Sequence, residues 1–221
     1  MKIFEKQLWH LISLVILIYG IIIFVDFSTL EGEFWGISTK TWLIYSVGIA
    51  IVHQIYVLLV WRLELYYSSI SKFLGKAGFK FYAAGFSIMF ISRSMLILAL
   101  SISSRNSLQI NPIIAYLIAF IFLLIALYLI YSVLRYFGLK RAYGIDHFDE
   151  SYRNKKFVKR GIFRFSNNAM YKFGFLFIWI PGLLLLSKPA IIVALFQHIY
   201  IWVHFYFTEL PDMKNIYSQI K

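Results

Sequence analysis

Six long apolar runs divide this chain, and they constrain its fold more than any other feature. They cover roughly Leu8–Val25, Thr41–Trp61, Phe81–Ser103, Pro112–Leu134, Tyr171–Ser187 and Pro189–Phe207. A helix crosses a bilayer with about 20 apolar residues, and each run is close to that length. An open sheet would leave backbone groups without hydrogen-bond partners in lipid. The sequence therefore predicts an all-α, polytopic membrane protein of about six transmembrane helices.

The composition agrees with this prediction. Hydrophobic residues make up 61% of the chain and charged residues only 14%, whereas a soluble domain carries about 25% charged residues. A formal net charge of +12 would suggest nucleic acid binding in a soluble protein. Here the basic residues flank the apolar runs, so we expect contacts with anionic lipid head groups and no nucleic acid partner. The chain has no cysteine, which excludes disulfides and thiolate metal sites.

The connections between the apolar runs alternate in charge. The segment from Asp26 to Lys40 holds three acids and one lysine, whereas residues 135–172 hold ten of the 22 basic residues. Basic connections stay in the cytosol. We therefore expect both termini and both long basic loops to be cytosolic, in a bacterial inner membrane or in the endoplasmic reticulum.

The connection between the fourth and fifth runs exceeds thirty residues and is rich in aromatic side chains. Long connections without secondary structure are uncommon unless they are functional or disordered, and aromatic residues argue against disorder. The sequence favours interfacial helices on the cytosolic leaflet here.

The whole chain divides into a four-span bundle over residues 1–134 and a C-terminal part over residues 135–221. The C-terminal part contains this cytosolic loop, a two-span hairpin and the tail, and we expect the two parts to form one integrated domain.

A polar cluster marks the start of the fifth run. Ser166, Asn167 and Asn168 are good helix N-cap residues, and a helix N-terminus binds carboxylate or phosphate groups. Arg164 would add a charged donor beside them. The alternative is ordinary capping of a membrane helix, with Arg164 as a topology signal.

The end of the sixth run supplies a second cluster. His198, Trp202, Phe205 and Glu209 follow the spacing of one α-helical face. The fifth and sixth runs are joined by a short turn, so Glu209 should return to the depth at which Tyr171 begins. The alternative reading of Glu209 is a solvated residue just past a helix end.

Other polar residues are weaker candidates. Arg93 lies midway through the third run, where a charge costs roughly 2.5–3.5 kcal/mol to insert, so it should face the bundle interior. The stretch Asp146-His147-x-Asp149-Glu150 has carboxylates and an imidazole but no further His or Cys at ligand spacing. We therefore expect no metal site.

The C-terminal part resembles a known membrane family over about Tyr136 to Tyr217. The resemblance rests on Tyr136-Phe137-Gly138-Leu139-Lys140, Gly161-Ile162-Phe163-Arg164-Phe165, Asn168-Ala169-Met170-Tyr171, Glu209-Leu210-Pro211 and Ile216-Tyr217. This pattern is similar to the membrane methyltransferases that include phosphatidylethanolamine N-methyltransferases and isoprenylcysteine carboxyl methyltransferases. Asn167 stands where that family usually has a basic residue, and Ala169 stands where it usually has proline.

The resemblance implies an S-adenosylmethionine-dependent methyltransferase that acts on the amino head group of a membrane phospholipid. It implies that Asn168, Met170, Tyr171 and Gly174 contact the cofactor. From the residues themselves we add Asn167 and Arg164 for its carboxylate and Trp202 for its sulfonium. We expect Glu209 and His147 to be catalytic, and Asp212 and Arg93 to contact substrate. Two alternatives remain: carboxyl methylation of an isoprenylcysteine-like substrate, which Asn167 disfavours, and a non-enzymatic carrier.

Overall fold

A computed structural model describes residues 2–153 and 155–217 of the chain, which are almost entirely helical. The α-helices are α1 (Gln7–Phe24), α2 (Thr39–Tyr67), α3 (Ser69–Leu74), α4 (Gly78–Ser103), α5 (Pro112–Ser132), α6 (Leu139–Ala142), α7 (Ile180–Leu184), α8 (Lys188–His204) and α9 (Leu210–Tyr217). One small antiparallel hairpin, β1 (Glu33–Phe34) and β2 (Ile37–Ser38), lies between α1 and α2. The predicted all-α membrane fold is confirmed.

Five helical stretches are long and apolar enough to cross a membrane: Lys2–Phe24, Thr39–Tyr67, Ser69–Ser103, Pro112–Phe137 and Lys188–Tyr217. The remaining predicted span is the shorter apolar stretch Met170–Leu184. At 1.5 Å per residue, an α-helix of that length would cover about 22 Å, less than the roughly 30 Å of a hydrocarbon core. Five of the six predicted spans thus have full length, and the fifth in chain order does not.

The short span is irregular before its proline. It begins as a π-helix over Met170–Gly174, continues as a 3-10 helix over Phe175–Trp179 and becomes α-helical only in α7. Pro181 stands in the first turn of α7, where its missing N–H costs no hydrogen bond. The change of helix type therefore precedes the Pro181-Gly182 pair, at which the sequence predicts a kink.

The turn into the last span is as tight as the sequence predicts. α7 ends at Leu184 and α8 begins at Lys188, and the Ser187 hydroxyl accepts a hydrogen bond from the Ala190 amide as the N-cap of α8.

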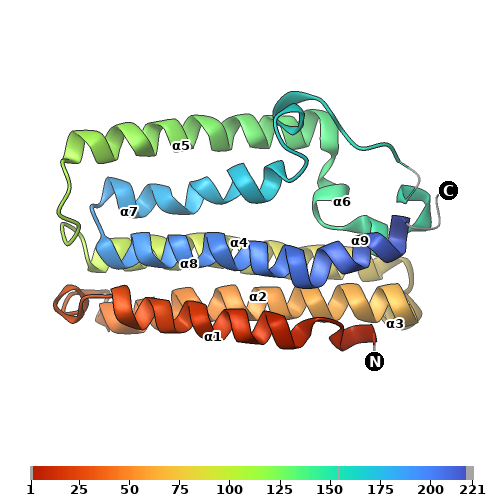
Figure 1. Ribbon diagram of the computed structural model, residues 1–221, viewed down its shortest axis with the longest axis horizontal. Helices are drawn as coiled ribbons and strands as arrows, with labels where there is room; N and C mark the ends of the chain where they lie inside the picture. The colour runs from red at the N-terminus through yellow and green to blue at the C-terminus, as the bar shows by residue number, and fades with distance from the viewer. Residues whose placement is uncertain (1, 154, 218–221) are drawn as a thin grey trace.

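The helices form a stack of layers that brings the two halves of the chain together. α1 and α2 lie on one side, α4 and α8 in the middle, and α7 and α5 on the other side (Figure 1). α8 contacts α1, α2 and α4, while α5 contacts α7. The central helix of the C-terminal part thus packs between N-terminal helices and α7. The core that it shares with α4 includes Ile97, Leu100 and Val193.

The two ends of the stack differ in the segments they gather. Both termini, α3 and the segment that contains α6 lie at one end, and the connections α1–α2, α4–α5 and α7–α8 lie at the other (Figure 1). This separation matches the alternation of basic and acidic connections in the sequence. The side of the membrane on which each end lies stays a prediction.

In the residues that the structure describes between α5 and the short span, there is no long interfacial helix. These residues form a π-helical turn over Val133–Phe137, then α6, and 3-10 turns over Ile145–His147, Glu150–Tyr152 and Gly161–Arg164. Gly144 has a φ of +76° and lies so close to Trp61 that a Cβ would stand 2.5 Å from its ring. A residue with this positive φ interrupts a regular helix. The close approach of Gly144 to Trp61 holds the segment against the end of α2. The predicted interfacial helices are therefore replaced by short turns that cover the bundle.

Candidate functional site

A pocket of about 770 Å³ lies at the end of the bundle that holds both termini. Its walls come from α6 and the turns that follow it, from the start of the short span, and from the end of the last span. They are formed by Trp61, Phe137, Arg141, Ala142, Gly144, Asp146, His147, Phe157, Val158, Lys159, Phe163, Asn167, Asn168, Met170, Tyr171, Phe205, Glu209, Leu210, Met213, Lys214 and Tyr217. All but Trp61 of α2 lie in the C-terminal part, and the volume is within the usual range for ligand sites.

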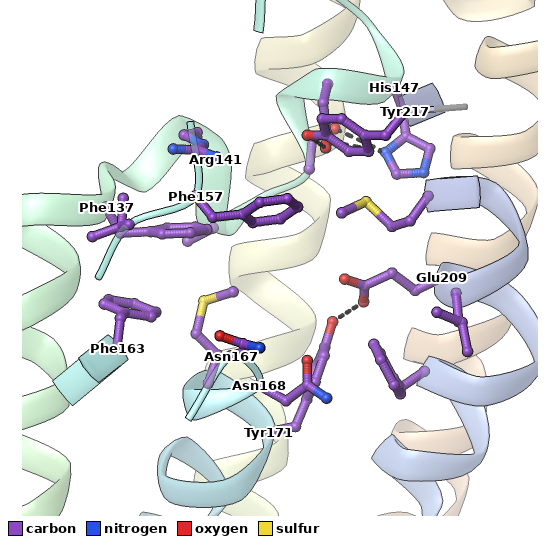
Figure 2. A pocket seen from close by; sticks show the side chains of 18 of the residues that line it. Phe137, Arg141, His147, Phe157, Phe163, Asn167, Asn168, Tyr171, Glu209 and Tyr217 are labelled. Carbon is purple, nitrogen blue, oxygen red and sulfur yellow. Dashed lines mark hydrogen bonds and ion pairs between the residues drawn. The ribbon is translucent and has the colours of Figure 1, made fainter. Parts of the chain in front are cut away.

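Glu209 and Tyr171 meet inside this pocket. Tyr171 belongs to the π-helix that opens the short span, and its hydroxyl donates a hydrogen bond to Glu209 Oε2. Figure 2 shows the two side chains pointing toward each other from facing elements. The structure therefore brings together the two ends of the hairpin as the sequence predicts.

The direction of Glu209 depends on a second π-helix. Residues Phe205–Glu209 form a π-helical turn between α8 and α9, so Glu209 does not follow the α-helical face predicted from His198 and Trp202. A π-turn replaces i→i+4 bonds by i→i+5 bonds and shifts the residues after it around the axis. The face on which Glu209 lies is therefore set by this local break in α-helical geometry.

Arg62 of α2 holds this π-turn from behind. Its Nη2 donates to the carbonyls of Phe207 and Thr208, at 3.2 and 3.4 Å, and its Nε donates to the Asp212 carboxylate at 3.1 Å. Both members of this ion pair are fully buried. Arg62 Nη1 also donates to Ile3 O, so one side chain joins the N-terminus, α2 and the start of α9.

The asparagine pair lies at the pocket, but its capping differs from the prediction. Asn167 and Asn168 both line the pocket together with Met170. The Ser166 hydroxyl accepts from the Asn168 amide at 3.2 Å, and the following π-helix has no side-chain cap. Ser166 therefore makes the local turn, which leaves both asparagine side chains to face the pocket (Figure 2).

The cations at the pocket are different from the predicted one. Arg164 is exposed, does not line the pocket and lies over the ring of Phe165, 4.7 Å from its centroid. Arg141, Lys159 and Lys214 line the pocket instead. The Arg141 guanidinium lies 4.9 Å from the Phe137 ring centroid, and Phe137 stacks on Phe163 at 4.9 Å. The Gly161–Arg164 turn buries Phe163 toward this stack, so Arg164 is directed outward.

His147 lines the pocket and lies in a buried polar network with Asp146 and Asp212. Its ring stacks on Trp61 at 4.2 Å, and its Nδ1 lies 3.3 Å from both Gly144 O and Asp146 Oδ1. Both of these oxygens are acceptors, so Nδ1 carries the proton in these bonds. Its Nε2 lies 3.9 Å from Asp212 Oδ2. His147 therefore lies between two carboxylates and is hydrogen-bonded to one of them, Asp146. Within residues 2–153 and 155–217, no cluster of three such groups is placed to hold a metal ion.

Asp146 links this network to the C-terminal helix. The Tyr217 hydroxyl of α9 donates to Asp146 Oδ2 at 3.0 Å. Burial by itself would raise the pKa of Asp146, but the hydrogen bond and charge of His147 and the bond from Tyr217 outweigh it and lower this pKa below its usual value. Asp146 therefore stays ionised at neutral pH and holds α9 over the pocket.

The remaining predicted site residues lie outside the pocket. Asp212 is buried in its ion pair with Arg62. Trp202 packs edge-on against Tyr171, with ring centroids 6.1 Å apart. Gly174 approaches α5, where a Cβ would stand 2.9 Å from Leu129 Cδ2. Arg93 and Gly174 both line a separate cavity within the bundle. A direct contact of these four residues with a ligand in the pocket is therefore not supported by their positions.

Sequence reasoning missed several wall residues. Arg141 directly follows the Tyr136–Lys140 stretch of the resemblance, which is a signal that could have identified it. Lys159 belongs to the basic cluster before Gly161 and carries no signal that separates it from its neighbours. Trp61 comes from α2, far away in sequence, and only the packing of α2 against the loop brings it to the pocket.

This arrangement has the groups to bind a zwitterionic ligand and to move a proton. Cationic side chains and asparagine amides line one wall, and the aromatic rings present faces for stacking. Glu209 offers a carboxylate that can accept a proton.

Comparison with known families supports the same assignment. The family model for phospholipid methyltransferases matches residues 114–220, which include every wall residue of the pocket except Trp61. Neither a curated protein nor a solved structure matches the chain. Residues 114–220 therefore match the phospholipid methyltransferase family, in agreement with the membrane methyltransferase resemblance seen in the sequence.

Proposed function

We propose that this integral membrane protein transfers a methyl group from S-adenosylmethionine to the amino head group of a phospholipid of the phosphatidylethanolamine type. The observation that carries the proposal is the meeting of Glu209 and Tyr171 in a pocket with cationic and amide side chains. This pocket is built almost wholly by the phospholipid methyltransferase domain.

The residues of the pocket fit the cofactor. Its carboxylate suits Arg141 or Lys159, since charge-assisted hydrogen bonds to such groups are the strong ones. Its adenine ring suits the aromatic wall of Phe137, Phe157 and Phe163, and the amides of Asn167 and Asn168 offer donors and acceptors to polar groups. When bound, the cofactor supplies an electrophilic methyl group on a positively charged sulfur.

Glu209 has the role of base in this proposal. An ammonium group has no lone pair, so the head group becomes a nucleophile only after it loses a proton. The Glu209 carboxylate attracts the cation and takes that proton. Tyr171 donates to Glu209 Oε2, which holds the carboxylate toward the pocket and leaves Oε1 for the substrate.

The topology supports delivery of both reactants to one place. The pocket lies at the end of the bundle with the termini and the basic segment, which the positive-inside rule puts in the cytosol. The soluble cofactor would enter from the cytosol and the lipid would enter sideways from the inner leaflet. Anionic lipid head groups would contact the basic residues around this end.

A product assay tests this proposal. Purified protein would be incubated with methyl-labelled S-adenosylmethionine and vesicles of phosphatidylethanolamine or of phosphatidylglycerol, which has no amine. We expect label in the amine lipid only, identified by chromatography as its N-methylated form. Absence of label from the amine lipid, with cofactor bound, would refute this acceptor.

Carboxyl methylation of an isoprenylcysteine-like substrate is the second candidate. The basic side chains of Arg141 and Lys159 favour it, because they could hold a substrate carboxylate. Glu209 argues against it, since it would repel that carboxylate. The same assay with a prenylated cysteine derivative as acceptor separates the two, because a carboxyl methyl ester loses its label in mild base and an N-methyl amine does not.

A further inference from the structure

A second cavity of about 450 Å³ lies deeper within the bundle. It is bounded by α2, α4, α5, α6, α8 and the irregular start of the short span. It shares Trp61, Ala142, Met170 and Tyr171 with the first pocket. Most of its wall is apolar, including Leu123, Leu127 and Phe90, which are also partly exposed on the outer surface of the bundle. Its shape and lining suit a hydrocarbon chain.

One cation interrupts this apolar wall. Arg93 of α4 is 3% exposed and lines the cavity. Its Nε donates to Gln197 Oε1 at 2.9 Å, and its guanidinium lies 5.0 Å from the Phe175 ring centroid. Its Nη2 is buried and has no hydrogen-bond partner among the described residues. A buried donor without a partner is costly, and the side chain that carries it lines the cavity.

The charge of Arg93 is also uncompensated. No aspartate or glutamate is among the residues that line the cavity, and Arg93 forms no ion pair within the described ranges. His53 lines the same cavity, and neither of its ring nitrogens has a partner there. A cation inside a membrane bundle normally pairs with an anion or faces a functional cavity, so the missing partner is an anionic group.

The position of Arg93 separates this site from the reaction site. Gln197, to which Arg93 donates, precedes Glu209 by twelve residues on one continuous helical stretch, which corresponds to about 18 Å along the axis. Arg93 is also the sixteenth of the 26 residues in α4, far from both of its ends. The phosphate of a bilayer phospholipid stays at the membrane surface, whereas a single-chain carboxylate can enter the bundle whole.

We propose that this cavity binds a long-chain carboxylate of the fatty acid type, with its carboxylate on Arg93 and its chain along the apolar wall. The site is distinct from the methyl-transfer site and does not require that reaction. Its occupation would fill the space beside Tyr171 and Met170, which the two cavities share.

Binding of tritiated oleate to the full-length protein in nonionic detergent at pH 8, without methyl donor, tests the proposal. We expect methyl oleate, which keeps the chain and loses the charge, to compete at least about tenfold more weakly than oleate. Arg93→Gln should weaken oleate binding by about tenfold to a hundredfold, the usual range for a hydrogen bond to a charged group, and should abolish the preference over the ester. Arg93→Lys should retain part of that preference.

Two further variants keep the test decisive. Arg105→Gln removes an exposed arginine from the α4–α5 connection and should bind oleate like the unmodified protein. Ala126 lines the cavity and is 6% exposed, so Ala126→Phe should fill the space and abolish oleate binding even if Arg93→Gln does not fold. Normal oleate binding by a folded Arg93→Gln or Ala126→Phe variant would overturn the proposal. Stronger competition by phosphatidic acid than by oleate would overturn the choice of a carboxylate.

Discussion

The two halves of the chain differ in the regularity of their helices. In the N-terminal half, α2 and α4 run for 29 and 26 residues in α-helical geometry. The C-terminal half contains π-helical turns at Val133–Phe137, Met170–Gly174 and Phe205–Glu209, and within the described residues π-turns occur only there. Each of the three contributes side chains to the pocket, among them Phe137, Tyr171 and Glu209. The regular N-terminal half packs against the C-terminal half. The pocket forms where the C-terminal helices depart from α-helical hydrogen bonding.

Among the contacts between the two halves, we expect that of Arg62 with Asp212 and the π-turn to matter most for stability. Arg62→Ala removes the partner of the buried Asp212 carboxylate and the donor to the π-turn carbonyls. Loss of one member of a buried ion pair costs about 3–5 kcal/mol, so the melting temperature in detergent should fall by many degrees. Arg105→Ala, at an exposed arginine, is the control. If Arg62→Ala melts like the unmodified protein, α2 does not hold the C-terminal half.

A double variant sharpens that result. Arg62→Met combined with Asp212→Leu replaces both charges by apolar side chains, and such exchanges are often neutral. We expect it to regain most of the stability lost by Arg62→Ala. Turnover should still be reduced, because methionine cannot donate to the carbonyls of the π-turn that directs Glu209.

Glu209→Gln should have the largest effect on the chemical step. The amide keeps the size of the side chain but cannot take the proton of an ammonium group. General acid–base groups contribute about 100-fold or more to rate, so we expect turnover to fall by at least that factor while cofactor affinity stays within a few-fold. Glu150→Gln, at an exposed glutamate that pairs with Arg153, should react normally. Normal turnover of Glu209→Gln, with a defect in His147→Gln instead, would move the base to His147.

The two arginines near the pocket provide a matched pair for cofactor binding. Arg141 lines the pocket and Arg164 faces away from it. A hydrogen bond to a charged group is worth about 1.5–3 kcal/mol, so Arg141→Ala should raise the cofactor dissociation constant by about one to two decades. Arg164→Ala should leave it unchanged in the same titration. If Arg164→Ala weakens cofactor binding and Arg141→Ala does not, the cofactor carboxylate lies at the outer side of the Gly161–Arg164 turn.

The smallest expected effect is a pH dependence of the contact between α9 and the loop. The lowered pKa of Asp146 means that its ionised form stabilises the folded state above its usual pKa near 4. This contribution is lost as the pH falls through the lower folded-state pKa. Proteolysis of the loop should therefore accelerate below about pH 4, and Asp146→Asn should show faster cleavage that no longer changes there. An identical acid response in both proteins would assign it to other carboxylates.

Much of the fold can be predicted from the sequence, because hydropathy reports which segments prefer lipid. The positions of α1, α2, α4, α5 and α8 follow from the apolar runs. The return of Glu209 to the depth of Tyr171 follows from the short Ser187 turn. The fifth apolar run, Tyr171–Ser187, is also the shortest of the six in the sequence. Hydropathy carries no information on hydrogen-bond register, so it does not predict the π-turns.

The sequence does not identify several residues of the site, for a different physical reason. Arg141 and Arg164 carry the same charge, and both lie in the basic connection between the fourth and fifth spans. Which one faces the pocket is decided by the turn that buries Phe163 against Phe137. Trp61 and Arg62 reach the site from α2 through long-range packing. Such contacts depend on the complete tertiary structure, which a single sequence pattern does not describe.

We expect the cofactor to bind in the irregular C-terminal half, and photo-crosslinking tests this expectation most directly. Purified protein would be irradiated with methyl-labelled S-adenosylmethionine, digested, and the labelled peptides identified by mass spectrometry. We expect the label between residues 137 and 171 or between 205 and 217, where the aromatic wall and Glu209 lie. Excess unlabelled cofactor should suppress it. Label in α1 to α4, in particular near Arg93, would contradict the account and place the cofactor in the regular half.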